Sequence, residues 1–153
     1  MERRIAYCAL ALIGALIVVG VVSDGVGRHL VQTAPAWLVV GLGMRGSGLT
    51  RWAAAPIFTI WLAIMVLIWL FLLHISNILH GHFSATEIAM TIIVALSAAC
   101  AFAFFFRGAA RTSMAAALAV FALAAALQCA ALWLSVQWPF YSDAALRAWA
   151  GWR

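Results

Sequence analysis

Long apolar runs separated by short polar breaks form the main pattern of this chain. Five such runs stand out, at residues 5–22, 30–44, 53–79, 88–106 and 113–138. The first run carries no charged side chain. A helix of that length covers about 27 Å at 1.5 Å per residue, which is just enough for the hydrocarbon core of a bilayer. The pattern therefore predicts membrane-spanning helices within one domain, residues 1–153.

The second run is shorter than the others and is interrupted by polar residues and a proline. Residues 30–44 would form a helix of about 22 Å, and they include Gln32, Thr33 and Pro35. A thin or tilted span, a re-entrant hairpin and an interfacial segment all fit this pattern. The polar, glycine-rich residues 45–51 that follow are predicted to be a connector.

Residues that begin and end helices mark the limits of the later runs. Pro56 suits the first turn of the third helix, where its missing N–H costs little. Ser84 and Glu87 have the spacing of a capping box, which predicts that the fourth helix begins there. Residues 80–83 are predicted to form a turn before it. After Pro139, residues 142–152 predict a short C-terminal interfacial helix.

Composition identifies the class of protein. Hydrophobic residues make up 68% of the chain and charged residues 8%, against roughly 45–50% and about 25% in soluble domains. This excludes a water-soluble enzyme, a nucleic-acid-binding protein and a disordered segment. It predicts an all-α, polytopic integral membrane bundle with four or five transmembrane helices. The arginines lie at the ends of apolar runs, where they meet lipid phosphates.

The distribution of arginine decides between four and five spans. If residues 30–44 do not cross the membrane, five arginines lie on one side and four on the other. If residues 30–44 do cross, six arginines lie on one side and three on the other. The six are Arg3, Arg4, Arg45, Arg51, Arg107 and Arg111, and the three are Arg28, Arg147 and Arg153. The positive-inside rule favours five spans with a cytoplasmic N-terminus, and the alanine-rich composition fits a bacterial plasma (inner) membrane. A cleaved signal peptide is the alternative for the first run, although such hydrophobic regions are usually about 7–15 residues long.

Small and polar side chains predict which helix faces pack together, because apolar burial does not favour helix contacts in lipid. On the third helix the predicted packing face comprises Thr59, Ala63, Val66, Leu70, His74 and Asn77, whereas Phe58, Trp61, Met65 and Trp69 are predicted to meet lipid. On the fourth it comprises Thr91, Ala95, Ala99 and Ala103. On the fifth it comprises Ala115, Ala119, Ala122, Ala126 and Ala130, with Gln128 and Ser135 on one shared face.

Imidazoles and carboxylates gather on the outer side in the five-span arrangement. His74, His80, His82 and Glu87 are candidate metal ligands, because neutral imidazoles with a carboxylate suit zinc, copper or iron. Alternatively, His80 and His82 are solvated in a loop, and His74 bonds to a nearby helix group. A bis-histidine haem would instead pair His74 with His29. We also expect His74 to approach Glu87, or else Thr91.

The predicted function is non-catalytic. The chain has no hydrolase or phosphate-binding motif, and the middle of each clear span lacks the charges that mark ion paths. We expect a subunit or accessory protein, without a cofactor, that packs with membrane lipids, with other membrane proteins or with copies of itself. The alternative is a metal- or haem-linked membrane redox enzyme, or a small carrier, that uses the outer histidines.

Overall fold

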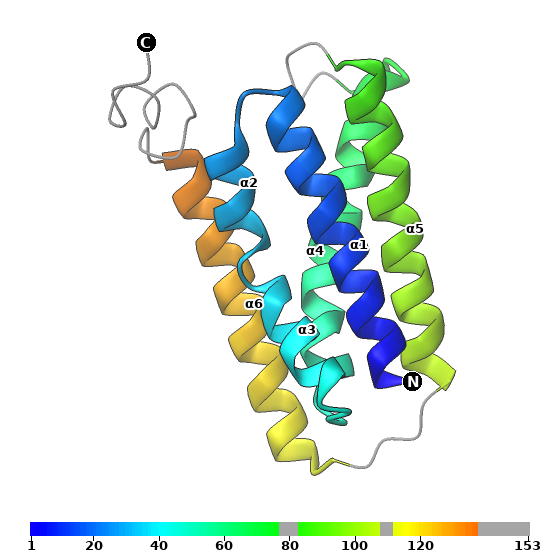
Figure 1. Ribbon diagram of the computed structural model, residues 1–153, viewed down its shortest axis with the longest axis vertical. Helices are drawn as coiled ribbons and strands as arrows, with labels where there is room; N and C mark the ends of the chain where they lie inside the picture. Colours follow the sequence, from blue (N-terminus) through cyan, green and yellow to red (C-terminus); the bar gives the residue numbers. More distant parts are fainter. Residues whose placement is uncertain (77–82, 108–111, 138–153) are drawn as a thin grey trace.

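A computed structural model describes residues 1–76, 83–107 and 112–137, and these residues contain helices and no strand (Figure 1). The helices are α1 (Glu2–Val22), α2 (Val26–Thr33), α3 (Ala36–Met44), α4 (Thr50–Leu72), α5 (Ala85–Arg107) and α6 (Met114–Gln137). Four of them, α1, α4, α5 and α6, are long and apolar enough to cross a membrane. The prediction of an all-α membrane bundle is therefore confirmed.

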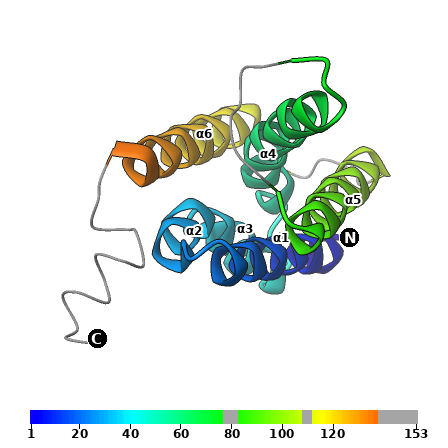
Figure 2. The ribbon, with the colours of Figure 1, turned by 90° about the horizontal axis from the view of Figure 1, so that it is seen from above.

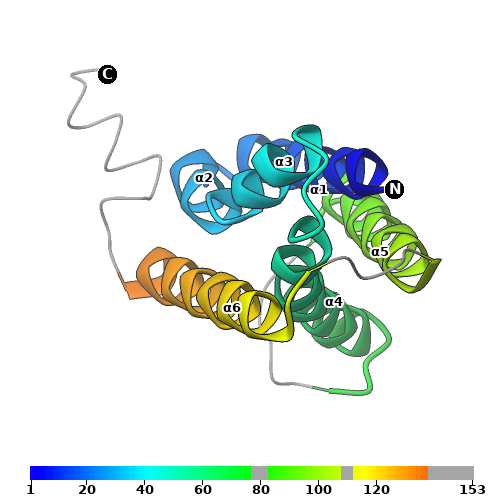
Figure 3. The ribbon, with the colours of Figure 1, turned by 90° about the horizontal axis from the view of Figure 1, so that it is seen from below.

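The helices form a ring of five rods, because α2 and α3 follow one another as a single broken rod. Seen along the bundle, α4 lies between α5 and α6, and α1 and the broken rod lie opposite (Figures 2 and 3). The rod contacts α1 along both halves, α6 through α2, and α4 through α3. It thus slants across the bundle and closes the ring.

The broken rod runs from one end of the bundle to the other (Figure 1). Gly20, near the end of α1, lies against His29 of α2, whereas Gly43 of α3 lies against Glu2 and Ala6 at the start of α1. The chain therefore passes five times between two ends, which we call the Glu2 end and the Glu87 end. This is the path expected if residues 30–44 cross, although α2 and α3 are each too short to cross alone.

Close packing and an ion pair hold the Glu2 end together. A Cβ atom on Gly43 would lie 2.6 Å from the Cβ of Ala6 and 2.8 Å from the carbonyl oxygen of Glu2, so only glycine fits there. The guanidinium of Arg51 donates to Glu2 Oε1 at 2.7 Å, and both side chains are nearly buried. Glu2 also lies in the first turn of α1, where the helix dipole favours its charge.

The limits of α4 differ from the sequence prediction. The helix begins at Thr50, which places Pro56 inside it rather than in its first turn, and it ends at Leu72 rather than Leu79. His74 adopts a left-handed conformation, with φ 58°. Its N–H bonds to Phe71 O, and the N–H of Ile75 bonds to Leu70 O, which together form a Schellman motif. His74 therefore terminates the helix instead of lying within it.

Other boundaries agree with the sequence. The Ser84–Glu87 capping box is present, since Ser84 N and Oγ each lie 2.7 Å from Glu87 Oε2, and Glu87 N donates back to Ser84 Oγ. Ser113 Oγ accepts from Ala116 N at the start of α6. Residues 80–82 of the predicted turn at 80–83, and the interfacial helix predicted at 142–152, lie outside the described residues.

The predicted packing face of α4 is wrong. Phe58, Trp61 and Met65, expected to meet lipid, are 1%, 3% and 4% exposed and form part of the core. Thr59 and Val66, expected to pack, are exposed. Thr59 Oγ1 donates to the carbonyl of Ala55 in its own helix, so this polar side chain needs no partner helix.

The small-residue faces of α5 and α6 are also largely misassigned. Ala99 and Ala103 of α5 are exposed, whereas Thr91 of the predicted face is buried as expected, and the other buried residues of α5 are Val94, Ser97, Ala98 and Ala101. On α6 all five alanines of the predicted face are exposed, namely Ala115, Ala119, Ala122, Ala126 and Ala130. The shared face of Gln128 and Ser135 is confirmed, because both are buried.

Candidate functional site

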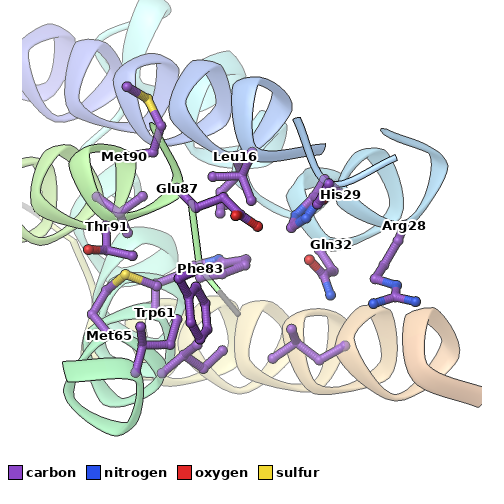
Figure 4. Close-up of a pocket in the computed structure, with 16 residues that line it drawn as sticks. Leu16, Arg28, His29, Gln32, Trp61, Met65, Phe83, Glu87, Met90 and Thr91 are labelled. Atoms are coloured by element: carbon purple, nitrogen blue, oxygen red, sulfur yellow. The ribbon is translucent and has the colours of Figure 1, made fainter. Parts of the chain in front are cut away.

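A cavity of about 280 Å³ lies inside the bundle at the Glu87 end, bordered by α1, α2, α4, α5 and α6 (Figure 4). Most of its wall is apolar and comes from the long helices. The apolar residues are Leu16, Val19, Trp61, Ile64, Met65, Ile68, Phe83, Met90, Val94 and Leu132. The polar residues are Ser23, Arg28, His29, Gln32, Glu87 and Thr91. The cavity therefore combines an apolar interior with a few polar groups of both signs.

Glu87 is the acidic residue among those that line the cavity. The capping box fixes its carboxylate, since both bonds from Ser84 end on Oε2. No described residue bonds to Oε1. Figure 4 shows the carboxylate pointing across the cavity toward the imidazole of His29. One oxygen thus maintains the helix start, and the other accepts no hydrogen bond from a described residue.

His29 and Arg28 reach the cavity from α2. The backbone of α2 comes close to α1 at Gly20, where an added Cβ would lie 3.0 Å from Val26 Cα and 3.1 Å from the His29 ring. Gly20 therefore allows the imidazole to lie over the end of α1. Arg28 is exposed, and its guanidinium points away from Glu87 toward α6 (Figure 4).

Two further polar groups lie deeper in the wall. Trp61 is 3% exposed, and its indole Nε1 is buried with no hydrogen-bond partner among the described residues. Thr91 is 5% exposed, and its hydroxyl donates to Ile88 O in its own helix. The indole N–H is thus a donor at the cavity wall that no described residue accepts.

Gln32 connects the cavity to the break between α2 and α3. In an unbroken helix the N–H of Ala36 would bond to Gln32 O, but here Gln128 Nε2 of α6 donates to that carbonyl at 3.1 Å. Gln32 Nε2 donates to Ser135 Oγ at 2.9 Å, and Ser135 Oγ donates to Leu132 O. These bonds satisfy the Gln32 carbonyl at the break and attach the broken rod to α6.

The residues predicted as metal ligands are not brought together where the structure describes them. His74 is exposed beyond the end of α4 and does not line the cavity, whereas Glu87 does. No hydrogen bond joins these two described side chains, and Thr91 bonds within its own helix. His80 and His82 lie outside the described residues. Within the described part of the chain, no group of three His, Cys, Asp or Glu is placed to hold a metal ion.

That His29 and Glu87 line one cavity was not predicted from the sequence. His29 precedes the uncertain second run, and the sequence suggested for it only a possible haem pairing with His74. The arginine count nevertheless placed His29 and Glu87 on the same side of the membrane. This shared side of the membrane was the only hint in the sequence that the two residues could lie near one cavity. The position of His29 over the end of α1 depends on the path of the broken rod.

Comparison with known proteins identifies no relative. No family model matches the chain, and no curated protein and no solved structure matches it. The class is therefore defined by the structure itself, as a helical bundle whose long apolar helices suit a membrane and which has a partly open cavity with a polar side.

Proposed function

We propose that this chain is a small, non-catalytic integral membrane protein, an accessory component that holds an amphiphilic molecule within its helical bundle. The observation that carries this proposal is the cavity at the Glu87 end. Its volume of about 280 Å³ approaches the lower limit of about 300 Å³ for ligand sites, which are typically apolar with a few placed polar groups.

The wall of the cavity favours an amphiphile over a purely polar ligand. Leu16, Ile64, Ile68 and Val94 offer an apolar surface, which stabilises a bound hydrocarbon group by dispersion and by exclusion of water. The polar groups Glu87 and His29 face each other across one side (Figure 4). A molecule with one polar end and an apolar body satisfies both parts of this wall.

The bonding of the polar side chains supports binding rather than catalysis. Glu87 Oε2 caps α5, the Thr91 hydroxyl bonds to its own helix, and Gln32 is held by α6. These groups are engaged in holding the bundle together. We therefore assign the cavity a holding role, with lipids and other membrane proteins as the partners of the outer surface.

The proposed orientation places the Glu2 end in the cytoplasm of a bacterial cell, with the protein in the inner membrane. The arginines Arg3, Arg4, Arg45, Arg51 and Arg107 lie at or near that end, and Arg28 lies at the other. This excess among the described residues fits the positive-inside rule. The cavity then opens near the outer surface.

Photolabelling with a neutral amphiphile tests the proposal. The probe is a long-chain fatty alcohol that carries a diazirine in its chain, added to the protein in maltoside micelles. We expect labelled peptides from the cavity-lining parts of α4 and α5. Val94→Phe, which fills the cavity from a residue 1% exposed, should lower this labelling several-fold, whereas Ile92→Phe on the exposed face should not. Labelling confined to the outer faces of the bundle, and insensitive to Val94→Phe, would refute the proposal.

A further inference from the structure

We propose that the molecule held in this cavity is a lipophilic organic cation, with an ammonium group at Glu87 and its apolar body between the helices. The inference rests on the proposed function, since it names the ligand class of the same cavity. Glu87, Trp61 and Phe83 carry the argument, and all three line the cavity.

Glu87 gives the cavity its carboxylate group. Glu87 is half-buried in the first turn of α5 and is the acidic residue among those that line the cavity. The capping box uses Oε2. A neutral glutamine would complete the same cap, because capping boxes accept either Glu or Gln at this position. The helix start therefore does not require the negative charge, whereas a cationic ligand does.

Two aromatic side chains line the same cavity as that carboxylate. They are Trp61, which comes from α4, and Phe83, which lies just before the start of α5 (Figure 4). The faces of aromatic rings attract ammonium groups, and this attraction strengthens when water is excluded. A carboxylate together with two aromatic rings recognises an alkylammonium group more specifically than it recognises an alcohol or an anion.

The wall also contains two methionines, which affect the shape of ligand that fits, and one cationic side chain, Arg28. Met65 and Met90 contribute flexible thioether side chains to the wall, which adapt to ligands of different outline. Arg28 would favour an anionic amphiphile, but it is exposed and points away from Glu87 (Figure 4). An exposed charge is screened by water and contributes little, so the cavity favours a cation.

Three diazirine probes with the same alkyl chain test this inference in maltoside micelles. They carry a trimethylammonium, a hydroxyl or a sulfate head. We expect the ammonium probe to label the cavity-lining peptides about ten times more than the sulfate probe, which corresponds to about 1.4 kcal/mol. Glu87→Gln should remove this preference while leaving labelling by the alcohol unchanged. Thr86→Gln, a change at the exposed neighbouring residue, should leave the preference intact.

The other outcomes separate the two proposals. If none of the probes labels the cavity, both the proposed function and this inference are wrong. If the alcohol labels it as strongly as the ammonium probe, or Glu87→Gln has no effect on the preference, the cavity binds amphiphiles but not cations in particular. If the sulfate probe labels it best and Arg28→Gln lowers that labelling, the ligand is anionic and this inference is overturned.

Discussion

The contact between α3 and α1 at Gly43 makes a sharp test of the packing at the Glu2 end. An added methyl group at Gly43 would lie 2.6 Å from Ala6 Cβ and 2.8 Å from the backbone oxygen of Glu2. The second neighbour is backbone and cannot move alone, so α1 and α3 must separate. Overpacking of this kind typically costs about 1–3 kcal/mol. We therefore expect Gly43→Ala to lower the free energy of unfolding.

Gly41→Ala is a matched control in the same helix, because a methyl group there would meet nothing within 4 Å. Alanine is more favourable than glycine inside a helix by about 0.5–1 kcal/mol, so this variant should be slightly more stable than the parent. Both variants gain the same helix propensity, so the difference between their free energies of unfolding isolates the steric cost at Gly43, about 1–3 kcal/mol. Unfolding in detergent, followed by circular dichroism, measures it. Equal stability of the two variants would show that α3 does not lie against α1 at Gly43.

Three further predictions address other parts of the bundle. Ala98→Leu should destabilise the bundle by about 1–3 kcal/mol through overpacking. Ala99→Leu, on the exposed side of α5, should change the stability little, and thermal unfolding of the two variants measures the difference. Gln128→Leu should cost about 1–3 kcal/mol because it leaves a buried carbonyl at the helix break without a donor; an unchanged unfolding midpoint would argue against the bond. Single cysteines at Gly46 and Ser84, in a background without native cysteine, should react with an impermeant maleimide from opposite sides of the membrane, and reaction of both from one side would contradict five passes.

The helices themselves were largely predictable from the sequence. The apolar runs predicted α1, α5 and α6 to within a few residues, and the Ser84–Glu87 capping box located the start of α5. These features depend on local properties, namely the length of an apolar run and the hydrogen-bond partners of the first helical turn. The polar side chains and Pro35 in the second run also indicated its irregularity, and the structure breaks the rod there.

The end of α4 was not predictable from local pattern. The apolar run continues past Leu72 to residue 79, so hydropathy contains no stop signal. The helix ends because His74 adopts the left-handed conformation of a Schellman motif. Histidine is among the residues that occupy this region more often than most, but neither glycine nor proline is present to announce the end.

Which face of each helix turns inward was decided only by the tertiary structure. In lipid an apolar side chain is about equally well solvated inside and outside the bundle, so hydropathy does not separate the two faces. The ring of five rods leaves an interior that large side chains such as Phe58, Trp61 and Met65 fill, while alanines such as Ala99 face outward. The sequence alone determined that the chain forms apolar helices suited to a membrane. The slant of the broken rod determined the cavity, because it places His29 opposite Glu87, and this depends on contacts between residues far apart in the chain.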